Sequence, residues 1–576
     1  MTIDSFIDLP VLSEKDVASV QVALQKGVSH FALSFASTRE SVLELRSLVG
    51  KNAFIISKVE SRRGVQNLDN ILEVTDALLI DRGDLSREVS LEKIPLLQKK
   101  IIQRANQKKV PVYVATNLLE SMIKVTKPTR AEVNDVVNTL LDGADGLVLA
   151  AETAIGQYPT QCVAMVSSMV DHFSEFHPDY DLKKFLNDHS SFLVKPHGGV
   201  LVQRLEEQPV NAKEIESIPS LFLQESYLMD VEQITLGTFS PLEGFMNKEE
   251  VDAVLENMRL PSGVSWPLPV VLPVTEKQAK SLKEGQVVRL VYEKDQCTYA
   301  LLHLEQIFTY DLKSFSEKMY GTNDISHPGV HRLYEMGNIF LSGKVTLIRR
   351  LQRAFKEYEL TPRQTRAIFE SKNWRRIVGF HTRNVLHRAH ETLQMDALEK
   401  YNCDGLFVHP VVGLKKKDDY SADIILQSYE WMLKNHYPKG KVLLGAFSTY
   451  SRYAGPREAV FTALCRKNFG CSHFIVGRDH TGVGNFYPPK AAWELFESID
   501  DLGIIPIFFD DVYFCNQCRR HVERCCHDKE NFASISGSQA RDLFRRGETP
   551  PDWFMRKDVA QLILDAMKEG REVFVS

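Results

Sequence analysis

The chain has 576 residues, of which 44% are hydrophobic and 25% are charged, and its formal net charge is −5. This length is too great for one hydrophobic core and predicts several domains. The composition is that of an ordinary globular protein, and the slightly acidic balance argues against nucleic acid or an acidic membrane as a partner. The sequence shows no signal-peptide pattern and no apolar run of bilayer length, so we expect a cytoplasmic protein without a membrane contact.

Residues 1–175 alternate short apolar strands with helix-length segments, a rhythm that predicts a parallel βα sheet. The expected strands cover residues 53–57, 77–80, 110–114 and 146–149. Polar residues follow these strands, at the sheet edge that carries the chemistry of βα folds. They are Lys58, Glu60, Arg82 to Asp84, Thr116 and Glu152.

The rest of the chain divides by pattern. Residues 176–196 are polar and predict a linker. Short alternating strands over 197–348, such as 287–291 and 299–302, predict a β-rich domain. The βα rhythm returns over 349–510, with strands expected at 377–380, 405–408, 442–444 and 474–476. The last segment, 511–576, holds a cysteine cluster and ends in a helical pattern near 559–568.

Two histidines three residues apart, His387 and His390, open an amphipathic run after the strand at 377–380. On a helix start they would share one face, where backbone N–H groups also favour an anion. Arg383 adds a planar fork that suits a tetrahedral oxyanion. A solvated basic helix start is the alternative, but the convergence of several donor types favours a phosphate site.

Three further motifs carry donors for an anion. The loop Gly477–Gly484 combines glycines with Arg478 and His480 directly after a predicted strand. The segment 451–458 places Arg452 after another strand. In 535–541, hydroxyl residues open a helix and Arg541 lies one turn inside it. Helix capping explains the serines, whereas phosphate binding explains the arginine as well.

Residues 195–576 resemble the ATP sulfurylases, the sulfate adenylyltransferases. The motifs that carry the resemblance lie at 237–246, 327–330, 382–390, 409–413, 453–459 and 477–480. The resemblance implies an enzyme that converts MgATP and sulfate into adenosine 5′-phosphosulfate and pyrophosphate. It also implies an α/β multidomain fold, with a PUA-like β domain before a Rossmann-like nucleotidyltransferase domain.

The resemblance also implies roles for individual residues. His387 and His390 would hold the ATP phosphates and stabilise the leaving pyrophosphate, while Thr382, Arg383, Asn384 and Arg452 would bind sulfate and the α-phosphate. The expected substrate-binding set further includes His381, Ala454, Gly477, Arg478, Asp479, His480, Ser538 and Arg541. Sulfate is already ionised, so catalysis needs positioning and charge stabilisation rather than a general base. Mg²⁺ would neutralise the phosphates.

One position departs from the family pattern. His381 stands where these enzymes usually have a glutamine that helps to hold sulfate, and Val385 replaces a frequent proline. A histidine also donates hydrogen bonds to sulfate, so the activity is compatible with the change. A nucleotidyltransferase acting on a different oxyanion is the alternative.

The cysteine cluster has the spacing of metal ligands, because Cys515 and Cys518 form a knuckle that supplies two ligands to tetrahedral zinc. The resembling sulfurylases carry a further Cys-Pro-His here, which implies Cys525 and His527 as the second pair. Cys526, at the proline position, is the alternative to Cys525.

Residues 9–173 resemble a different family, the pyruvate kinases, in the second half of their barrel. The motifs are at 9–16, 56–60, 82–85, 115–122, 128–132 and 141–145. By this resemblance Glu60 and Asp84 would chelate Mg²⁺ or Mn²⁺, and Lys58 and Thr116 would contact a small pyruvate-like acid. The expected fold is a partial TIM-barrel-like βα domain.

This resemblance is incomplete. Roughly 165 residues are too few for a closed (β/α)8 barrel, which takes about 250. We therefore do not expect pyruvate kinase activity. A retained site that regulates the enzyme or organises a homo-oligomer, a structural relic, and a sensor or scaffold that binds a pyruvate-like ligand are the readings that stay open.

Overall fold

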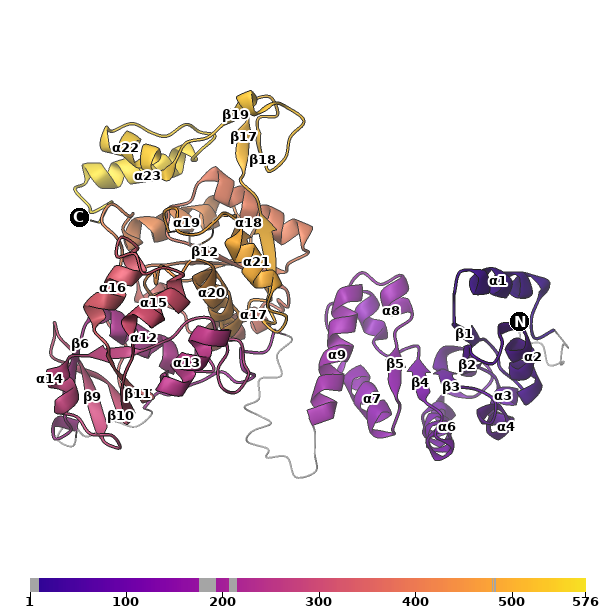
Figure 1. Cartoon of the computed structure of the whole chain (residues 1–576). Coiled ribbons are helices and arrows are strands. Elements are labelled where there is room, and N and C mark those ends of the chain that lie inside the picture. The colour runs from indigo at the N-terminus through magenta and orange to yellow at the C-terminus, as the bar shows by residue number, and fades with distance from the viewer. Residues whose placement is uncertain (1–9, 176–192, 207–214, 479, 481–482, 576) are drawn as a thin grey trace. The chain divides into compact units, whose positions relative to one another are not determined.

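The computed structural model describes residues 10–175, 193–206, 215–478, 480 and 483–575 (Figure 1). The chain divides into two compact units, Met1–Phe192 and Leu193–Ser576. Within the described residues, no helix is both long enough and apolar enough to cross a membrane. Much of the segment predicted to be a linker, together with Asp479, lies outside the described residues.

The N-terminal unit contains a parallel five-stranded sheet whose strands follow one another in chain order. The strands are β1 His30–Leu33, β2 Phe54–Val59, β3 Ala77–Asp81, β4 Val112–Ala115 and β5 Gly146–Val148. The four strands expected from the sequence are confirmed, and β1 was missed. The helices are α1 Glu14–Gln25, α2 Arg39–Val49, α3 Arg62–Gln66, α4 Leu68–Leu72, α5 Arg82–Leu85, α6 Ile94–Lys108, α7 Arg130–Leu141, α8 Ala151–Ala154 and α9 Pro159–Glu175.

Local sequence explains why these helices begin where they do. Thr38 and Thr129 close capping boxes at the starts of α2 and α7, each with its side chain accepting a backbone N–H three residues on. Ile55, Ile80 and Val112 are fully buried in the sheet core. The sheet ends at β1 and β5, so five strands form an open sheet rather than a barrel.

The C-terminal unit begins with a six-stranded sheet in the order β6-β9-β10-β11-β7, with β8 also paired to β11. The strands are β6 Ser220–Leu223, β7 Gly244–Phe245, β8 Leu272–Val274, β9 Val287–Tyr292, β10 Thr298–Thr309 and β11 Ile339–Leu347. Five helices accompany it: α12 Glu225–Thr235, α13 Lys248–Asn257, α14 Glu276–Lys280, α15 Leu312–Tyr320 and α16 Pro328–Met336. The prediction of a β-rich region missed these helices. In α12 every residue from Leu228 to Thr235 is buried, including the charged residues Asp230 and Glu232.

A second parallel sheet follows, in the order β14-β13-β12-β15-β16. Its strands are β12 Ile377–Thr382, β13 Gly405–Pro410, β14 Val442–Leu444, β15 His473–Gly477 and β16 Ile505–Phe509, which confirms the strands expected here. The helices are α17 Pro362–Ser371, α18 Arg388–Lys400, α19 Ala422–Asn435, α20 Pro456–Phe469 and α21 Ala491–Glu497. The strand order reverses between β12 and β15, the switch point at which such sheets bind ligands.

Helices cover both faces of this sheet. Ile377 belongs to the core shared with α17 and α20, whereas its neighbour Val378 belongs to the core shared with α18 and α19. Figure 1 shows the two pairs of helices on opposite sides of β12. This alternation along β12 gives the doubly wound arrangement.

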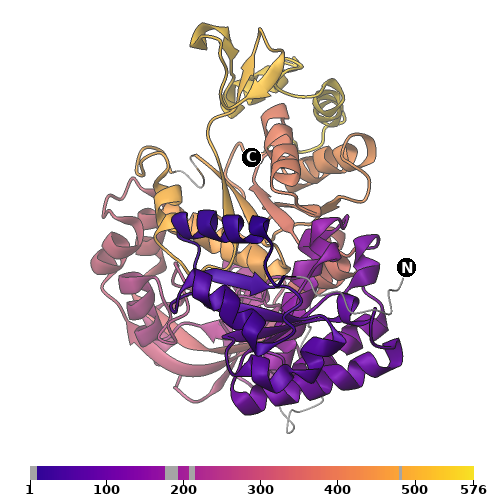
Figure 2. The ribbon, with the colours of Figure 1, turned by 90° about the vertical axis from the view of Figure 1, so that its right-hand side faces the viewer.

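The chain ends in a small sheet, β17 Tyr513–Cys515, β18 Arg520–Val522 and β19 Phe532–Ala533, followed by α22 Gly537–Arg545 and α23 Lys557–Lys568. Both views place the small sheet at one end of the C-terminal unit (Figures 1 and 2). The predicted helix at 559–568 is confirmed in α23, whose Val559 and Ile563 pack with Ile424 of α19.

Candidate functional site

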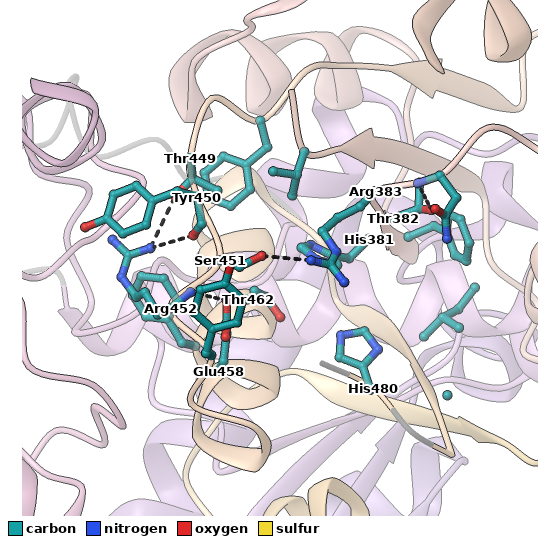
Figure 3. A pocket seen from close by; sticks show the side chains of 18 of the residues that line it. His381, Thr382, Arg383, Thr449, Tyr450, Ser451, Arg452, Glu458, Thr462 and His480 are labelled. Carbon is teal, nitrogen blue, oxygen red and sulfur yellow. Dashed lines mark hydrogen bonds between the residues drawn. The ribbon is translucent and has the colours of Figure 1, made fainter. Parts of the chain in front are cut away.

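A cavity of about 390 Å³ lies at the carboxyl edge of β12 and β15. Its polar lining comes from the ends of these strands and the loops after them, from the loops after β13 and β14, and from α18 and α20 (Figure 3). These residues are His381, Thr382, Arg383, Asn384, His390, Lys416, Thr449, Ser451, Arg452, Glu458, Thr462 and His480. The structure therefore brings together most of the motifs that the sequence singled out.

Arg383 carries an unneutralised charge in this cavity. Its Nη1 donates to Ser451 Oγ at 3.2 Å, and no carboxylate of the described residues forms an ion pair with it. Just before it, the Thr382 hydroxyl accepts the backbone N–H of Asn384 at 3.1 Å, which fixes the turn after β12. A guanidinium without a carboxylate partner is poised for an anion.

Arg452 differs, because it is already paired. Its Nη2 donates to Asp230 of α12, which also accepts the Tyr450 hydroxyl at 2.6 Å. Although burial disfavours the charge, Asp230 raises the pKa of Arg452. Glu458 fixes the loop by accepting the backbone N–H groups of Arg452 at 2.9 Å and Ala454 at 3.1 Å. The N–H group of Ala454 is therefore engaged within the protein.

The histidines of the site are neutral at pH 7. Burial lowers the pKa of His387 and of His480 to about 4, and it lowers the pKa of His381 and His390 well below the usual value. The rings of His387 and His390 stack with centroids 3.6 Å apart. Their Nδ1 atoms, and that of His381, find no hydrogen-bond partner among the described residues. These neutral rings offer hydrogen bonds rather than charge.

A second cavity of about 210 Å³ adjoins the histidine pair. It is lined by Asn384 and His387 on one side and by Gly537 and Arg541 of α22 on the other. Ser536 caps α22, and the Ser538 hydroxyl accepts Arg541 Nη2 at 3.1 Å. His387 is itself the N-cap of α18, so two helix starts border this space.

The loop after β15 lies partly at the first cavity. Gly477 and His480 line it, and a side chain at Gly477 would meet open space. Arg478 forms a salt bridge with Asp511 at 2.9 Å instead. The prediction for Asp479 falls outside the described residues. The sequence analysis missed Asp230 and Lys416, and the missed ion pair of Asp230 with Arg452 spans elements that no sequence spacing connects.

Four potential metal ligands converge in the C-terminal segment. The Sγ atoms of Cys515, Cys518 and Cys525 and the Nδ1 atom of His527 lie within 4.8 Å of one another. Cys518 and Cys525 are 3.4 Å apart, and Cys525 and His527 are 3.2 Å apart. Zn–S bonds of about 2.3 Å in a tetrahedron set ligands about 3.7 Å apart, close to these separations. Cys526 is exposed and lies outside the group.

A carboxylate cluster occupies the carboxyl edge of the N-terminal sheet. Glu60, Asp81 and Asp84 place ligand oxygens within 4.8 Å of one another. Lys58 bridges Glu60 at 2.5 Å and Asp81 at 3.6 Å, and these carboxylates raise its pKa although partial burial opposes the rise. Thr116 Oγ1 accepts the N–H of Gly83 at 2.8 Å. The sequence analysis missed Asp81, the last residue of β3.

Thr116 is held in an unusual backbone conformation. Its φ of 69° is uncommon for a β-branched residue, and Asn117 follows with φ 54°. Arg82 holds this turn by donating to the carbonyl oxygens of Thr116 at 2.8 Å and Asn117 at 3.0 Å. Such strain persists where the surroundings fix it, and here it brings the Thr116 hydroxyl to the carboxylates.

A switch point lined by an unpaired arginine and neutral histidines suits a phosphate-bearing substrate, as in a nucleotidyltransferase-like enzyme. Family models match residues 356–566 (ATP-sulfurylase), 194–350 (PUA-like domain) and 2–163 (pyruvate kinase, barrel domain). The sulfate adenylyltransferase of Halothermothrix orenii is 43% identical over 385 residues, which are 66% of this chain and 100% of that relative. The Synechococcus enzyme of the same name is 44% identical over 65% of this chain and 97% of its own length. The chain belongs to the sulfate adenylyltransferase family.

A solved structure agrees with the fold. A hexameric APS kinase from Thiobacillus denitrificans superposes with a TM-score of 0.52 at 21% identity, covering 64% of this chain and 67% of that one. The two resemblances expected from the sequence are thus confirmed, and so is the expectation of a nucleotidyltransferase.

Proposed function

We propose that the C-terminal unit catalyses direct in-line attack of sulfate on the α-phosphate of MgATP, which yields adenosine 5′-phosphosulfate and pyrophosphate. The observation that carries this mechanism is the unpaired Arg383 at the switch point, in a cavity also lined by His390, with a second cavity lined by His387. Family membership supports the reaction.

Sulfate would bind at Arg383, with Thr382 and Asn384 beside it. Arg452 would contribute N–H groups toward sulfate and the α-phosphate rather than net charge, because Asp230 neutralises it. Sulfate is fully ionised at pH 7 and needs no general base, and the lowered pKa values make the histidines neutral hydrogen-bonding groups rather than cations. Positioning and charge stabilisation are then the main sources of rate enhancement.

The leaving pyrophosphate would lie toward the second cavity. His387 and His390 would donate to it from one side, and Ser538, Arg541 and the start of α22 from the other. Mg²⁺ enters as part of the MgATP substrate and neutralises phosphate charge. The nucleoside would lie along Gly477, Arg478, Asp479 and His480, where Gly477 leaves open space.

The test is release of pyrophosphate from MgATP with sulfate, molybdate, phosphate or no acceptor. We expect release that depends on sulfate or molybdate. Arg383→Ala should lower kcat/KM for sulfate by about a hundredfold or more, whereas Arg363→Ala, an exposed arginine of α17, should not. Equal activity of both variants would contradict the assignment.

His381 favours a second candidate, a different oxyanion acceptor. The ring is buried, its Nδ1 has no partner in the described residues, and it sits 5.6 Å from the His480 ring. His381→Gln should raise the preference for sulfate over other oxyanions if the native acceptor differs. Unchanged preference would leave sulfate as the acceptor.

The cysteine cluster is proposed to bind structural zinc through Cys515, Cys518, Cys525 and His527. The ligand separations and the exposure of Cys526 support this set. Bound zinc would stabilise a segment whose strands are two or three residues long. A thiolate site of this kind also favours the reducing cytoplasm.

For the N-terminal unit we propose a regulatory site that binds Mg²⁺ or Mn²⁺ together with a small pyruvate-like acid. Three carboxylates, Lys58 and the Thr116 hydroxyl support it. Mn²⁺ with oxalate should raise the melting temperature of this unit in the full chain and change the sulfurylase rate. A shift in melting temperature without a change in rate would support the sensor or scaffold interpretation, and no shift would support a structural relic.

We also propose that the chain forms a homo-oligomer, and light scattering tests this.

A further inference from the structure

A side cavity of about 100 Å³ shares Arg383 with the main cavity. Its charged and polar lining is Arg332, Arg383, Lys415, Lys416, Asp419 and Ser451. Arg383, Lys416 and Ser451 line the main cavity as well, so the two spaces share a wall. The sulfurylase roles proposed above use only Arg383 of this set.

The side cavity carries an excess of positive charge. Four cations surround it with one carboxylate, Asp419, which accepts the backbone N–H of Lys416 at 3.3 Å. Among the described residues, none of the four cations forms an ion pair with an acid. Arg332 and Lys416 instead lie over the rings of Tyr450 at 4.0 Å and Tyr453 at 4.4 Å.

The loop after β13 holds Lys415 and Lys416 close to the main cavity. A Cβ at Gly413 would meet the carbonyl oxygen of Thr449 at 1.9 Å, so only glycine lets the loop after β13 approach the loop after β14 this closely. Lys415 Nζ then donates to the backbone carbonyl of Arg383 at 3.4 Å. Burial lowers the pKa of Lys415 to about 8, which still leaves it mostly charged at pH 7.

The volume of the side cavity and the exposure of its lining residues indicate which kind of ligand it admits. Its volume of about 100 Å³ is about a quarter of that of the main cavity, at about 390 Å³, which suits a small oxyanion better than a nucleotide. Leu414 is 46% exposed and Lys416 is exposed, whereas Arg383 is half-buried. The lining therefore runs from the surface to Arg383.

We propose that the side cavity is an entry site that captures a small tetrahedral dianion of the sulfate class and delivers it to Arg383. This inference rests on the proposed function of the main cavity. Lys415 and Lys416 act as positioning residues, since a cluster of like charge beside low-dielectric walls raises the local concentration of a dianion. No bond forms or breaks in this step.

The double variant Lys415→Met/Lys416→Met tests the site in the zinc-loaded full chain. We expect KM for sulfate to rise about tenfold, with kcat and KM for MgATP within twofold of the wild type. The dependence of kcat/KM for sulfate on ionic strength should also weaken. Lys415→Arg should behave like the wild type. Lys417→Met is the matched control, because Lys417 is exposed on the same loop outside the cavity lining.

An unchanged KM for sulfate, or an equal rise for MgATP, would overturn the entry site. Lys416→Met alone, at an exposed position, gives the same test if the double variant does not fold, with a rise of about threefold expected. Calorimetric binding of sulfate in the presence of α,β-methylene-ATP separates the two proposals. If the variant binds sulfate more weakly but the wild type shows no turnover, only the sulfurylase mechanism is refuted. If the wild type turns over and the variant binds sulfate as tightly as the wild type does, only the entry site is refuted.

Discussion

The two units share one sheet architecture, but the carboxyl edges of their sheets suit ligands of opposite charge. Each contains a five-stranded parallel sheet with polar residues at its carboxyl edge. In the N-terminal unit the cations are neutralised, with Lys58 on Glu60 and Arg82 on Asp135 at 2.6 Å, and carboxylates remain. In the C-terminal unit Arg383 has no carboxylate partner among the described residues. Ion pairing within the edge, rather than the sheet, therefore decides whether such an edge suits a cation or an anion.

The largest effect should come from the histidine pair. His390→Ala removes a neutral donor whose ring stacks on His387, and kcat should fall about a hundredfold to a thousandfold. Steady-state pyrophosphate release measures this. His331→Ala, at a 56% exposed histidine of α16, is the control and should leave kcat unchanged. Normal turnover of His390→Ala would remove the proposed pyrophosphate site.

The sequence predicted the strands of both parallel sheets well, because buried parallel strands are continuous apolar runs bounded by turns. It also placed the anion-binding motifs directly after strands of the second sheet, and most of them line one cavity at the carboxyl edge of that sheet. It did not predict α12, in which the polar residues Asp230, Glu232 and Gln233 are buried together with the apolar ones.

Pairing across the fold was beyond the sequence. From the sequence, Arg452 and Arg383 had the same expected role, as donors to an anion, yet Asp230 of α12 neutralises only the first. Asp81 was also missed. It is the last residue of the apolar strand β3 and was not counted among the polar residues that follow the strand. For the adjacent Cys525 and Cys526 the family resemblance implied Cys525, and it is Cys525 that lies with the other three potential ligands.

The cysteine cluster provides the next largest expected effect. Cys518→Ala should abolish stoichiometric zinc and lower activity about tenfold to a hundredfold, because β17 and β19 help to line the cavity beside His387. Cys526→Ala should keep both zinc and activity. Elemental analysis and turnover measure the two outcomes. Zinc loss in Cys526→Ala would show that the other cysteine is the ligand.

A smaller change tests the N-terminal edge. Asp84→Asn should weaken Mn²⁺ binding about tenfold, since a neutral amide replaces one of three carboxylates. Calorimetry on the full chain measures the affinity. Asp69→Asn is the control, because Asp69 is an exposed partner of Arg104 away from the cluster. Equal affinity in both variants would make the carboxylates structural.

The last comparison of the two units uses pH, with stability rather than activity as the quantity measured. Burial lowers the pKa of His197, His387 and His480 to about 4, against 6.5 for the ordinary group. Between these values the unfolded chain binds more protons than the folded one, so the stability of the C-terminal unit falls as the pH drops from 6.5 toward 4. Each histidine contributes up to about 1 kcal/mol per pH unit.

The N-terminal unit should lose stability only at a lower pH. Burial opposes the change, but hydrogen bonds from Ser121 and Thr129 lower the pKa of Glu132 below its usual 4.5. That stabilisation is complete above the unfolded pKa and is lost only as the pH falls through the lower folded pKa. Scanning calorimetry of the full chain at pH 7, 6 and 5 should therefore show the transition of the C-terminal unit moving down while that of the N-terminal unit stays. Parallel movement of both transitions would mean that the buried histidines do not govern the difference, and that the contrast between the two edges does not extend to stability.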